Sequence, residues 1–172
     1  MKILGLCGSL RAASINAGLL RSAVRLAPVG VEMEIAHEVG RLPLFNPDLE
    51  NDPPRIVRDL CGRVARADAL VVASPEYAHG VTGVIKNALD WLVSMEDFAG
   101  KPVAIWNASP RAHHSDDALR EILLTMSADV VAAASIGLPL VGAGVSEAAM
   151  RETPAIAQAI RGALACLQAH RA

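Results

Sequence analysis

"KILGLCGSLRAASIN", residues 2–16, begins as an apolar run and changes abruptly into small and hydroxyl-bearing residues. The run at 2–7 is nearly all apolar, which is typical of a parallel β-strand covered on both faces. Gly8 allows a tight turn, and helical periodicity begins at about residue 14. The stretch therefore predicts a strand, a polar loop and a helix, in that order.

The same succession recurs along the chain. Further strands are predicted at 31–36, 69–74, 102–107 and 130–136. Helices are predicted at about 14–26, 52–67, 80–94, 116–127 and 154–169. Thr153 before Pro154, and Ser115 before two aspartates, are expected to cap the last two helices. Repeated strand–helix alternation predicts a three-layer α/β sandwich around a five-stranded parallel sheet.

Composition and charge exclude several classes of protein. A length of 172 residues with 52% hydrophobic residues predicts one well-packed domain over residues 1–172. A net charge of -2 gives no reason to expect nucleic acid or an anionic membrane as partner. Cys7, Cys61 and Cys166 lack metal-binding spacing and are expected to be reduced thiols in a cytoplasmic protein. The uncharged stretch 130–145 is shorter than a membrane span of ~20 residues and contains Gly and Pro.

The topology predicts where a ligand binds. In a doubly wound sheet of strand order 2-1-3-4-5, the ligand lies between the carboxyl ends of strands 1 and 3, where the winding reverses. The loops that follow strands 1, 3 and 4 are 8–16, 75–80 and 109–111. These loops carry most of the unusual polar residues of the chain, so we expect them to share one rim.

The first loop has the composition of an anion site. It opens a helix, so free backbone N–H groups and the positive end of the helix dipole face outward. Ser9, Ser14 and Asn16 add polar side chains, and Arg11 adds a guanidinium suited to phosphate oxygens. This set fits a terminal phosphate monoester. The alternative is that Ser14 only caps the helix while Arg11 is solvated.

Two other phosphate-binding motifs do not match. A dinucleotide fingerprint reads G-x-G-x-x-G after the first strand, whereas this chain reads Gly5-Leu6-Cys7-Gly8-Ser9-Leu10-Arg11. A small Cys-dependent phosphatase would place its Arg six residues after the nucleophile. Arg11 comes only four residues after Cys7, so Cys7 is expected to be a packed strand residue.

The second loop, "SPEYAHG" at 74–80, offers a platform for a flat ring. Pro75 stiffens the turn, and Tyr77, the only Tyr of the chain, can lie against a ring. The backbone N–H groups of Glu76 and Tyr77 are expected to bond polar atoms at the edge of that ring. His79 could relay protons, but a lone His before Gly is more often a turn residue.

Two further stretches have less specific patterns. In the helix at 80–94, Lys86 and Asp90 are spaced for an i,i+4 ion pair, and the helix is apolar enough to contact a second subunit. "HHSDD" at 113–117 could suggest a metal site, but adjacent His side chains diverge and the aspartates suit a helix start. We therefore expect no metal and no acid–base catalytic residue.

Together, "GSLRAASIN" (8–16), "LPLFNPDLE" (42–50), "SPEYAHGVTGVIKNALDW" (74–91) and "ASP" (108–110) resemble the NADPH-dependent FMN reductase family of flavodoxin-like proteins. That family includes quinone, azo-dye and chromate reductases. The resemblance implies FMN as cofactor, NADPH or NADH as co-substrate, and a quinone, azo compound, free flavin or metal oxyanion as acceptor. It also implies a homodimer or homotetramer through the helix of Lys86 and Asp90.

The resemblance assigns roles to particular positions. It places the FMN phosphate on Ser9, Arg11, Ser14 and Asn16, and the isoalloxazine on Pro75, Glu76, Tyr77 and Ser109. The chain departs from the family at Ala78, where Asn is common, and in a shorter third loop at 109–115. A flavin-binding electron carrier, and a phosphatase or flavin-free nucleotide binder, are the alternatives.

Overall fold

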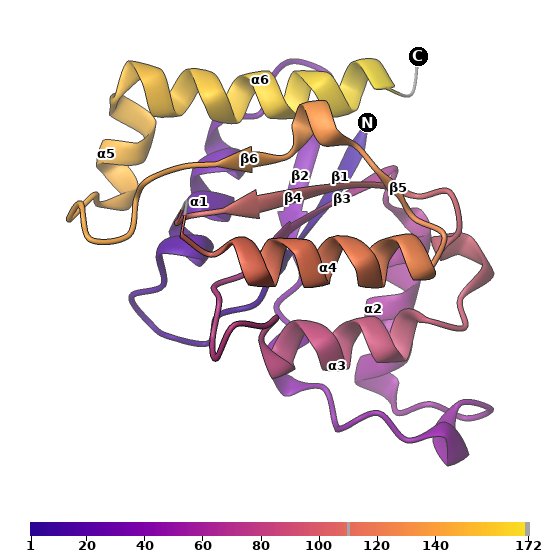
Figure 1. Cartoon of the computed structure of the whole chain (residues 1–172). Coiled ribbons are helices and arrows are strands. Elements are labelled where there is room, and N and C mark those ends of the chain that lie inside the picture. Colours follow the sequence, from indigo (N-terminus) through magenta and orange to yellow (C-terminus); the bar gives the residue numbers. More distant parts are fainter. Residues whose placement is uncertain (110, 171–172) are drawn as a thin grey trace.

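A computed structural model describes residues 1–109 and 111–170 of the chain (Figure 1). Pro110, in the predicted third loop, lies outside the described residues. The strands are β1 (Lys2–Cys7), β2 (Glu32–Ile35), β3 (Ala69–Ala73), β4 (Pro102–Asn107), β5 (Asp129–Val130) and β6 (Ile136–Gly137). The α-helices are α1 (Ile15–Leu26), α2 (Arg55–Arg66), α3 (Gly83–Leu92), α4 (His113–Thr125), α5 (Glu147–Glu152) and α6 (Pro154–His170).

The strands form one parallel sheet of order β2-β1-β3-β4-β5, with β6 also paired to β4. The predicted strand order is therefore confirmed. The second strand, β2, lies at the sheet edge with Met33 buried and Glu32 and Glu34 exposed, so its apolar and acidic residues alternate between the two faces. Among the described residues, no helix has both the length and the apolar character that a membrane span requires.

The last strand differs from its prediction. Instead of one strand over 130–136, a 3₁₀ turn, η4 (Ala132–Ala134), separates β5 from β6. Ala has low β-propensity, and three consecutive alanines occupy this turn. The Ser135 hydroxyl fills part of the gap: it accepts a hydrogen bond from the Ile105 N–H at 3.0 Å and donates one to the Val131 carbonyl at 3.0 Å.

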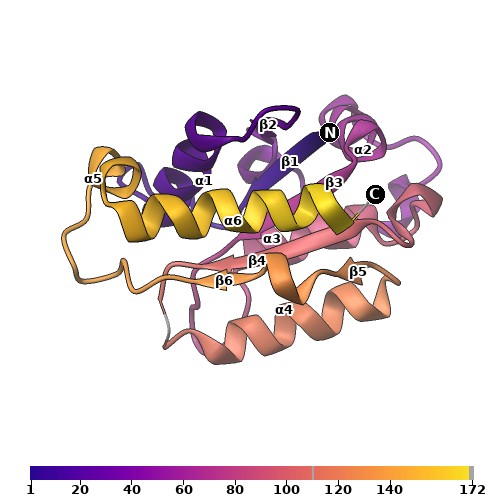
Figure 2. The same ribbon diagram turned by 90° about the horizontal axis from the view of Figure 1, so that it is seen from above.

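Helices cover both faces of the sheet, as predicted from the nearly continuous apolar sequences of the central strands (Figure 2). Successive residues of a strand point to opposite faces. Ile3, Val71 and Trp106 belong to the core shared with α1 and α6, whereas Leu4 and Val72 belong to the core shared with α2, α3 and α4. This packing fixes β1, β3 and β4 in the middle of the molecule, so the loops after them have a rigid base.

The helix starts differ from their predictions in several places: α2 and α3 each begin three residues later than predicted, at Arg55 and Gly83. The α4 helix begins at His113, and its N-cap is Ala112 rather than Ser115, which lies inside the first turn. The α5 helix was not predicted, although Ser146 caps it by accepting a hydrogen bond from the Ala149 N–H at 3.1 Å. A six-residue helix contains too few turns to show helical periodicity in the sequence.

Arg63 on α2 ties the edge of the sheet to the helix layer. Its guanidinium donates to both carboxylate oxygens of Glu38 at 2.8 Å, to Glu34 at 3.1 Å and to the Ile35 carbonyl at 3.0 Å. The side chains of Arg63 and Glu38 are only 17% and 15% exposed. Burial raises the pKa of Glu38, but the hydrogen bonds and charge of Arg63 outweigh that effect, and the pKa lies below its usual value.

Arg63→Ala is therefore expected to lower the free energy of unfolding by about 1–3 kcal/mol at pH 7, because Glu38 would remain charged without its partner. The Glu38 pKa is lower in the folded protein, so the pair contributes stability above the unfolded-state pKa of about 4.3. That contribution is lost as the pH falls through the folded-state pKa. Urea unfolding at pH 7 and in acid measures it, and exposed Arg66→Ala on the same helix is the control. A deficit that stayed constant into acid would contradict the assignment.

Candidate functional site

A cavity of about 350 Å³ opens at the carboxyl ends of β1, β3 and β4, where the loops that follow these three strands meet. In Figure 1 these loops lie at the left edge of the sheet. All of the predicted site residues line this cavity: Ser9, Arg11, Ser14, Asn16, Pro75, Glu76, Tyr77 and Ser109. The sheet topology therefore brings together side chains that are up to a hundred residues apart in the sequence.

The first loop holds several polar groups without partners. Ser14 is the N-cap of α1, with its hydroxyl accepting from the Ala17 N–H at 3.1 Å. The Arg11 side chain is exposed and makes no hydrogen bond or ion pair with any described residue. Asn16 is 5% exposed, and its Oδ1 atom is buried with no partner in the described part of the chain. Ser14 thus caps the helix, as the alternative interpretation predicted. Arg11 and Asn16 line the same cavity, and their side chains have polar atoms that can still form hydrogen bonds with a ligand.

Gly8 allows the first and second loops to lie against each other. Its N–H donates to the Ala73 carbonyl at 2.9 Å, so the chain leaves β1 beside the end of β3. A Cβ atom at Gly8 would lie 2.2 Å from the Ser74 hydroxyl oxygen and 2.8 Å from Ile85 Cγ1. Only glycine fits at this position without displacing Ser74 or Ile85.

The second loop makes a tight turn. Tyr77 and Gly80 exchange backbone hydrogen bonds of 3.2 and 3.0 Å, and both residues between them, Ala78 and His79, have positive φ. The Tyr77 N–H therefore bonds within its own turn, and its predicted availability to a ligand is wrong. The Glu76 N–H has no acceptor among the described residues. The Tyr77 side chain is 60% exposed and lines the cavity.

The turn is strained at Ala78, where φ is 48°. Left-handed backbone costs a non-glycine residue about 1–2 kcal/mol, whereas the extra entropy cost of Gly is about 0.5–1 kcal/mol. Asn tolerates this conformation better than Ala, which gives a physical reason for the Asn that is common in the resembling family.

Ala78→Gly is expected to raise the free energy of unfolding by about 0.5–1 kcal/mol, the difference between these two costs. The matched control is Ala99→Gly, because Ala99 is also exposed but has an ordinary φ of -62°. Chemical denaturation of both variants measures the effect. Equal destabilisation by both substitutions would mean that the turn is not strained.

The third loop is organised by a residue that the sequence analysis did not single out. Asn107, at the end of β4, accepts from the Ser109 N–H at 2.8 Å and donates to the Ala112 carbonyl at 3.0 Å. Asn107, Arg111, Ala112 and Val141 also line the cavity. A polar residue that ends an apolar strand was the available signal for Asn107, whereas Val141 reaches the rim through a long loop with no local signal.

The histidines and Cys7 stand apart from the cavity lining. The rings of His79 and His114 stack with centroids 4.3 Å apart, and those of His113 and His114 are 4.1 Å apart. Burial raises the pKa of the Cys7 thiol, and a raised pKa disfavours the nucleophilic thiolate. In the described part of the chain, no three His, Cys, Asp or Glu residues group as a metal site.

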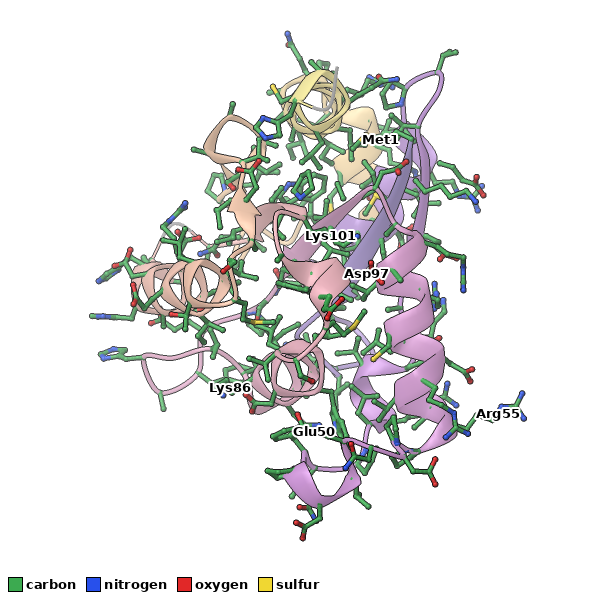
Figure 3. The ribbon with its side chains drawn as sticks, turned by 90° about the vertical axis from the view of Figure 1, so that its right-hand side faces the viewer. Met1, Glu50, Arg55, Lys86, Asp97 and Lys101 are labelled. Carbon is green, nitrogen blue, oxygen red and sulfur yellow. The ribbon has the colours of Figure 1, made fainter. Side chains whose placement is uncertain are left out.

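The segment 42–50 is fastened to α3. Asn87 accepts from the Phe45 N–H at 2.8 Å and donates to the Pro43 carbonyl at 3.0 Å, and the Trp91 indole donates to the same carbonyl at 2.8 Å. Lys86 and Asp90 form the expected i,i+4 ion pair on this helix. Figure 3 shows Lys86 on α3 beside the segment that carries Glu50. Leu44, which belongs to this segment, is 84% exposed.

Comparison with known proteins decides the family. Residues 1–142 match the model of the family described as NADPH-dependent FMN reductase. The chain belongs to this family. The matched residues contain all three loops of the cavity, whereas α5 and α6 lie beyond them. The predicted family is confirmed.

Individual FMN reductase relatives show the extent of the similarity. An NAD(P)H-dependent FMN reductase of Pseudomonas aeruginosa is 41% identical, and a quinone reductase of Escherichia coli is 34% identical, each over 113 residues. Each alignment covers 63% of this chain and 60% of the relative's own length. A solved flavoenzyme NAD(P)H:(acceptor) oxidoreductase (FerB) from Paracoccus denitrificans has a TM-score of 0.75 at 24% identity, covering 98% of both chains. This structure confirms the flavodoxin-like fold.

Proposed function

We propose that the protein is an NAD(P)H-dependent FMN reductase that passes hydride to FMN and then reduces a small acceptor. The observation that carries this proposal is that one cavity is lined by a guanidinium and a buried amide oxygen, neither of which has a partner among the described residues, and by an exposed Tyr. The family match and the names of the two relatives above support the assignment. The acceptor classes are quinones, azo compounds, free flavins and metal oxyanions.

The phosphate end of FMN fits the first loop. Ser9, Arg11, Ser14 and Asn16 would hold the phosphate, assisted by the positive end of α1. Asn16 supports this fit most directly, because a buried oxygen without a donor is costly to leave unsatisfied. A ribityl hydroxyl could donate to Asn16 Oδ1 while the amide nitrogen donates to phosphate. One ligand would then provide hydrogen-bond partners for both the oxygen and the nitrogen of the Asn16 side-chain amide.

The ring end fits the second and third loops. Pro75, Glu76 and Tyr77 would line one side of the isoalloxazine, and Ser109 would approach it from the third loop. The free Glu76 N–H can donate to a polar atom of the ring, whereas the Tyr77 N–H is already bonded to Gly80. A cavity of about 350 Å³ lies at the lower end of the usual range for small-ligand sites.

The residues around the cavity suit a reaction that depends on orientation. When bound, FMN would supply the chemistry of accepting and returning a hydride. The protein's part is then to hold the ring with one face open and to exclude water. Glu76, the acidic side chain of the lining, accepts a hydrogen bond from the Ser115 backbone N–H.

The first test is reconstitution of the purified protein with FMN, followed by addition of NADPH and a quinone. The proposal predicts bound flavin absorbance after removal of excess FMN, and FMN-dependent oxidation of the nicotinamide. NADH in parallel measures the coenzyme preference. Bound FMN without nicotinamide oxidation would favour an electron carrier. A protein that stayed colourless would favour a phosphatase or a flavin-free nucleotide binder.

We further propose a homodimer or homotetramer that forms through α3 and the adjoining segment 42–50. Leu44 and Val93 support this surface, since they are large apolar residues that are 84% and 53% exposed. Sedimentation velocity tests it with the variant Leu44→Asp, which should shift the protein toward monomer. The three free cysteines favour a cytoplasmic location, where thiols stay reduced.

A further inference from the structure

The first turn of α4 lacks a local cap. Its N-cap residue, Ala112, has no side chain that could accept a hydrogen bond, so the backbone N–H groups of the first turn need acceptors from elsewhere. Ser115 is the third residue of the helix and is 3% exposed, which puts its N–H out of reach of bulk water. An unpartnered N–H at such a position is unfavourable.

Glu76 supplies the missing acceptor from a different loop. Its Oε2 atom accepts from the Ser115 N–H at 2.9 Å, across a sequence separation of 39 residues. The carboxylate forms no ion pair with any described residue, so this hydrogen bond and the positive end of the α4 dipole are its stabilising partners. Glu76 therefore caps the N-terminus of α4, a role that a local Ser or Asp has in other helices.

The bond joins two of the elements whose residues line the cavity. Glu76 belongs to the wall made by the second loop, and Ala112 and Ser109 belong to the wall made by the third loop. The ring stack of His79 on His114, at 4.3 Å, joins the same two elements a second time. Two contacts thus attach the strained turn at Ala78 to the first turn of α4, which is the kind of support that a left-handed turn requires.

We propose that the Glu76 carboxylate is a positioning residue that holds the second and third loops at the separation FMN requires. This role rests on the proposed FMN binding and is separate from the ligand contact of the Glu76 backbone. Without the carboxylate, α4 would lose its cap and the third loop would be free to move away from the ring. FMN affinity would then fall although no phosphate contact has changed.

The test compares Glu76→Ala with Glu76→Gln, which keeps an oxygen acceptor but loses the charge. In the apoprotein, hydrogen exchange of the Ser115 amide, followed by NMR, should accelerate about tenfold or more in Glu76→Ala, as expected for loss of one charged hydrogen bond. The dissociation constant of FMN, from quenching of its fluorescence, should rise about tenfold, equivalent to about 1.4 kcal/mol. Glu76→Gln should restore most of both properties.

Ser146→Ala is the matched control, because it removes the cap of α5 away from the cavity. It should lower the melting temperature without changing FMN affinity. Unchanged Ser115 exchange in Glu76→Ala would overturn the proposed bond. If Glu76→Ala exchanges the Ser115 amide faster but binds FMN with unchanged affinity, Glu76 acts only as a helix cap, and the positioning role is overturned. Failure of the wild-type protein to bind FMN would instead overturn the proposed function, and Ser115 exchange would still test the bond.

Discussion

Gly8→Ala is expected to lower the free energy of unfolding by about 1–3 kcal/mol, the usual cost of adding a methyl group to a fully packed site. The new Cβ would lie 2.2 Å from Ser74 Oγ, 2.7 Å from Ser74 Cβ and 2.8 Å from Ile85 Cγ1. Neither neighbour can move easily, since Ser74 is 4% exposed and Ile85 is fully buried. The expected response is that the first loop shifts away from the end of β3.

Gly83→Ala provides the control for this substitution. Gly83 is the first residue of α3, and a Cβ there would meet nothing within 4 Å. Ala is also the better helix former, so this variant should be neutral or slightly more stable. Urea unfolding of both variants measures the difference. Equal stability of the two variants would contradict the claim that close contact between β1 and the second loop requires glycine.

The location of the site could be predicted from the sequence because it depends on the strand order and on the handedness of the connections. Apolar runs at 2–7, 69–74 and 102–107 identify the central strands, and the handedness of their connections places the following loops on one edge. Every residue chosen from those loops lines the cavity. In contrast, the break in the last strand was not predicted, because a run of apolar residues does not show where pairing with β4 is interrupted and the Ser135 hydroxyl takes part of its place.

Details of the loops were less predictable because they depend on backbone conformation. Positive φ at both Ala78 and His79 turns the Tyr77 N–H toward Gly80, and neither residue type signals that turn as strongly as Gly or Asn would. Ser115 was expected to cap a helix over about 116–127, because a local hydroxyl usually caps a helix. The actual acceptor is Glu76, which lies 39 residues earlier in the chain.

Arg11→Ala is expected to weaken FMN binding by about 1.5–3 kcal/mol, the contribution of a hydrogen-bonded ion pair to a phosphate. This range corresponds to an increase in the dissociation constant of roughly ten- to a hundredfold. The folded protein itself should lose little stability, because the Arg11 side chain is exposed and makes no hydrogen bond or ion pair with a described residue. The effect should also weaken with added salt, since an exposed cation is screened.

Riboflavin separates a phosphate contact from a general effect of Arg11, because it has the same ring and ribityl chain without the phosphate. Arg11→Ala should weaken FMN binding and leave riboflavin binding unchanged. Arg25→Ala is the control for charge, since Arg25 is exposed at the opposite end of the same helix. Fluorescence titration of both flavins against the three proteins gives the comparison. An equal loss for FMN and riboflavin would show that Arg11 does not contact the phosphate, and the first loop would then need another anion to explain its unpartnered groups.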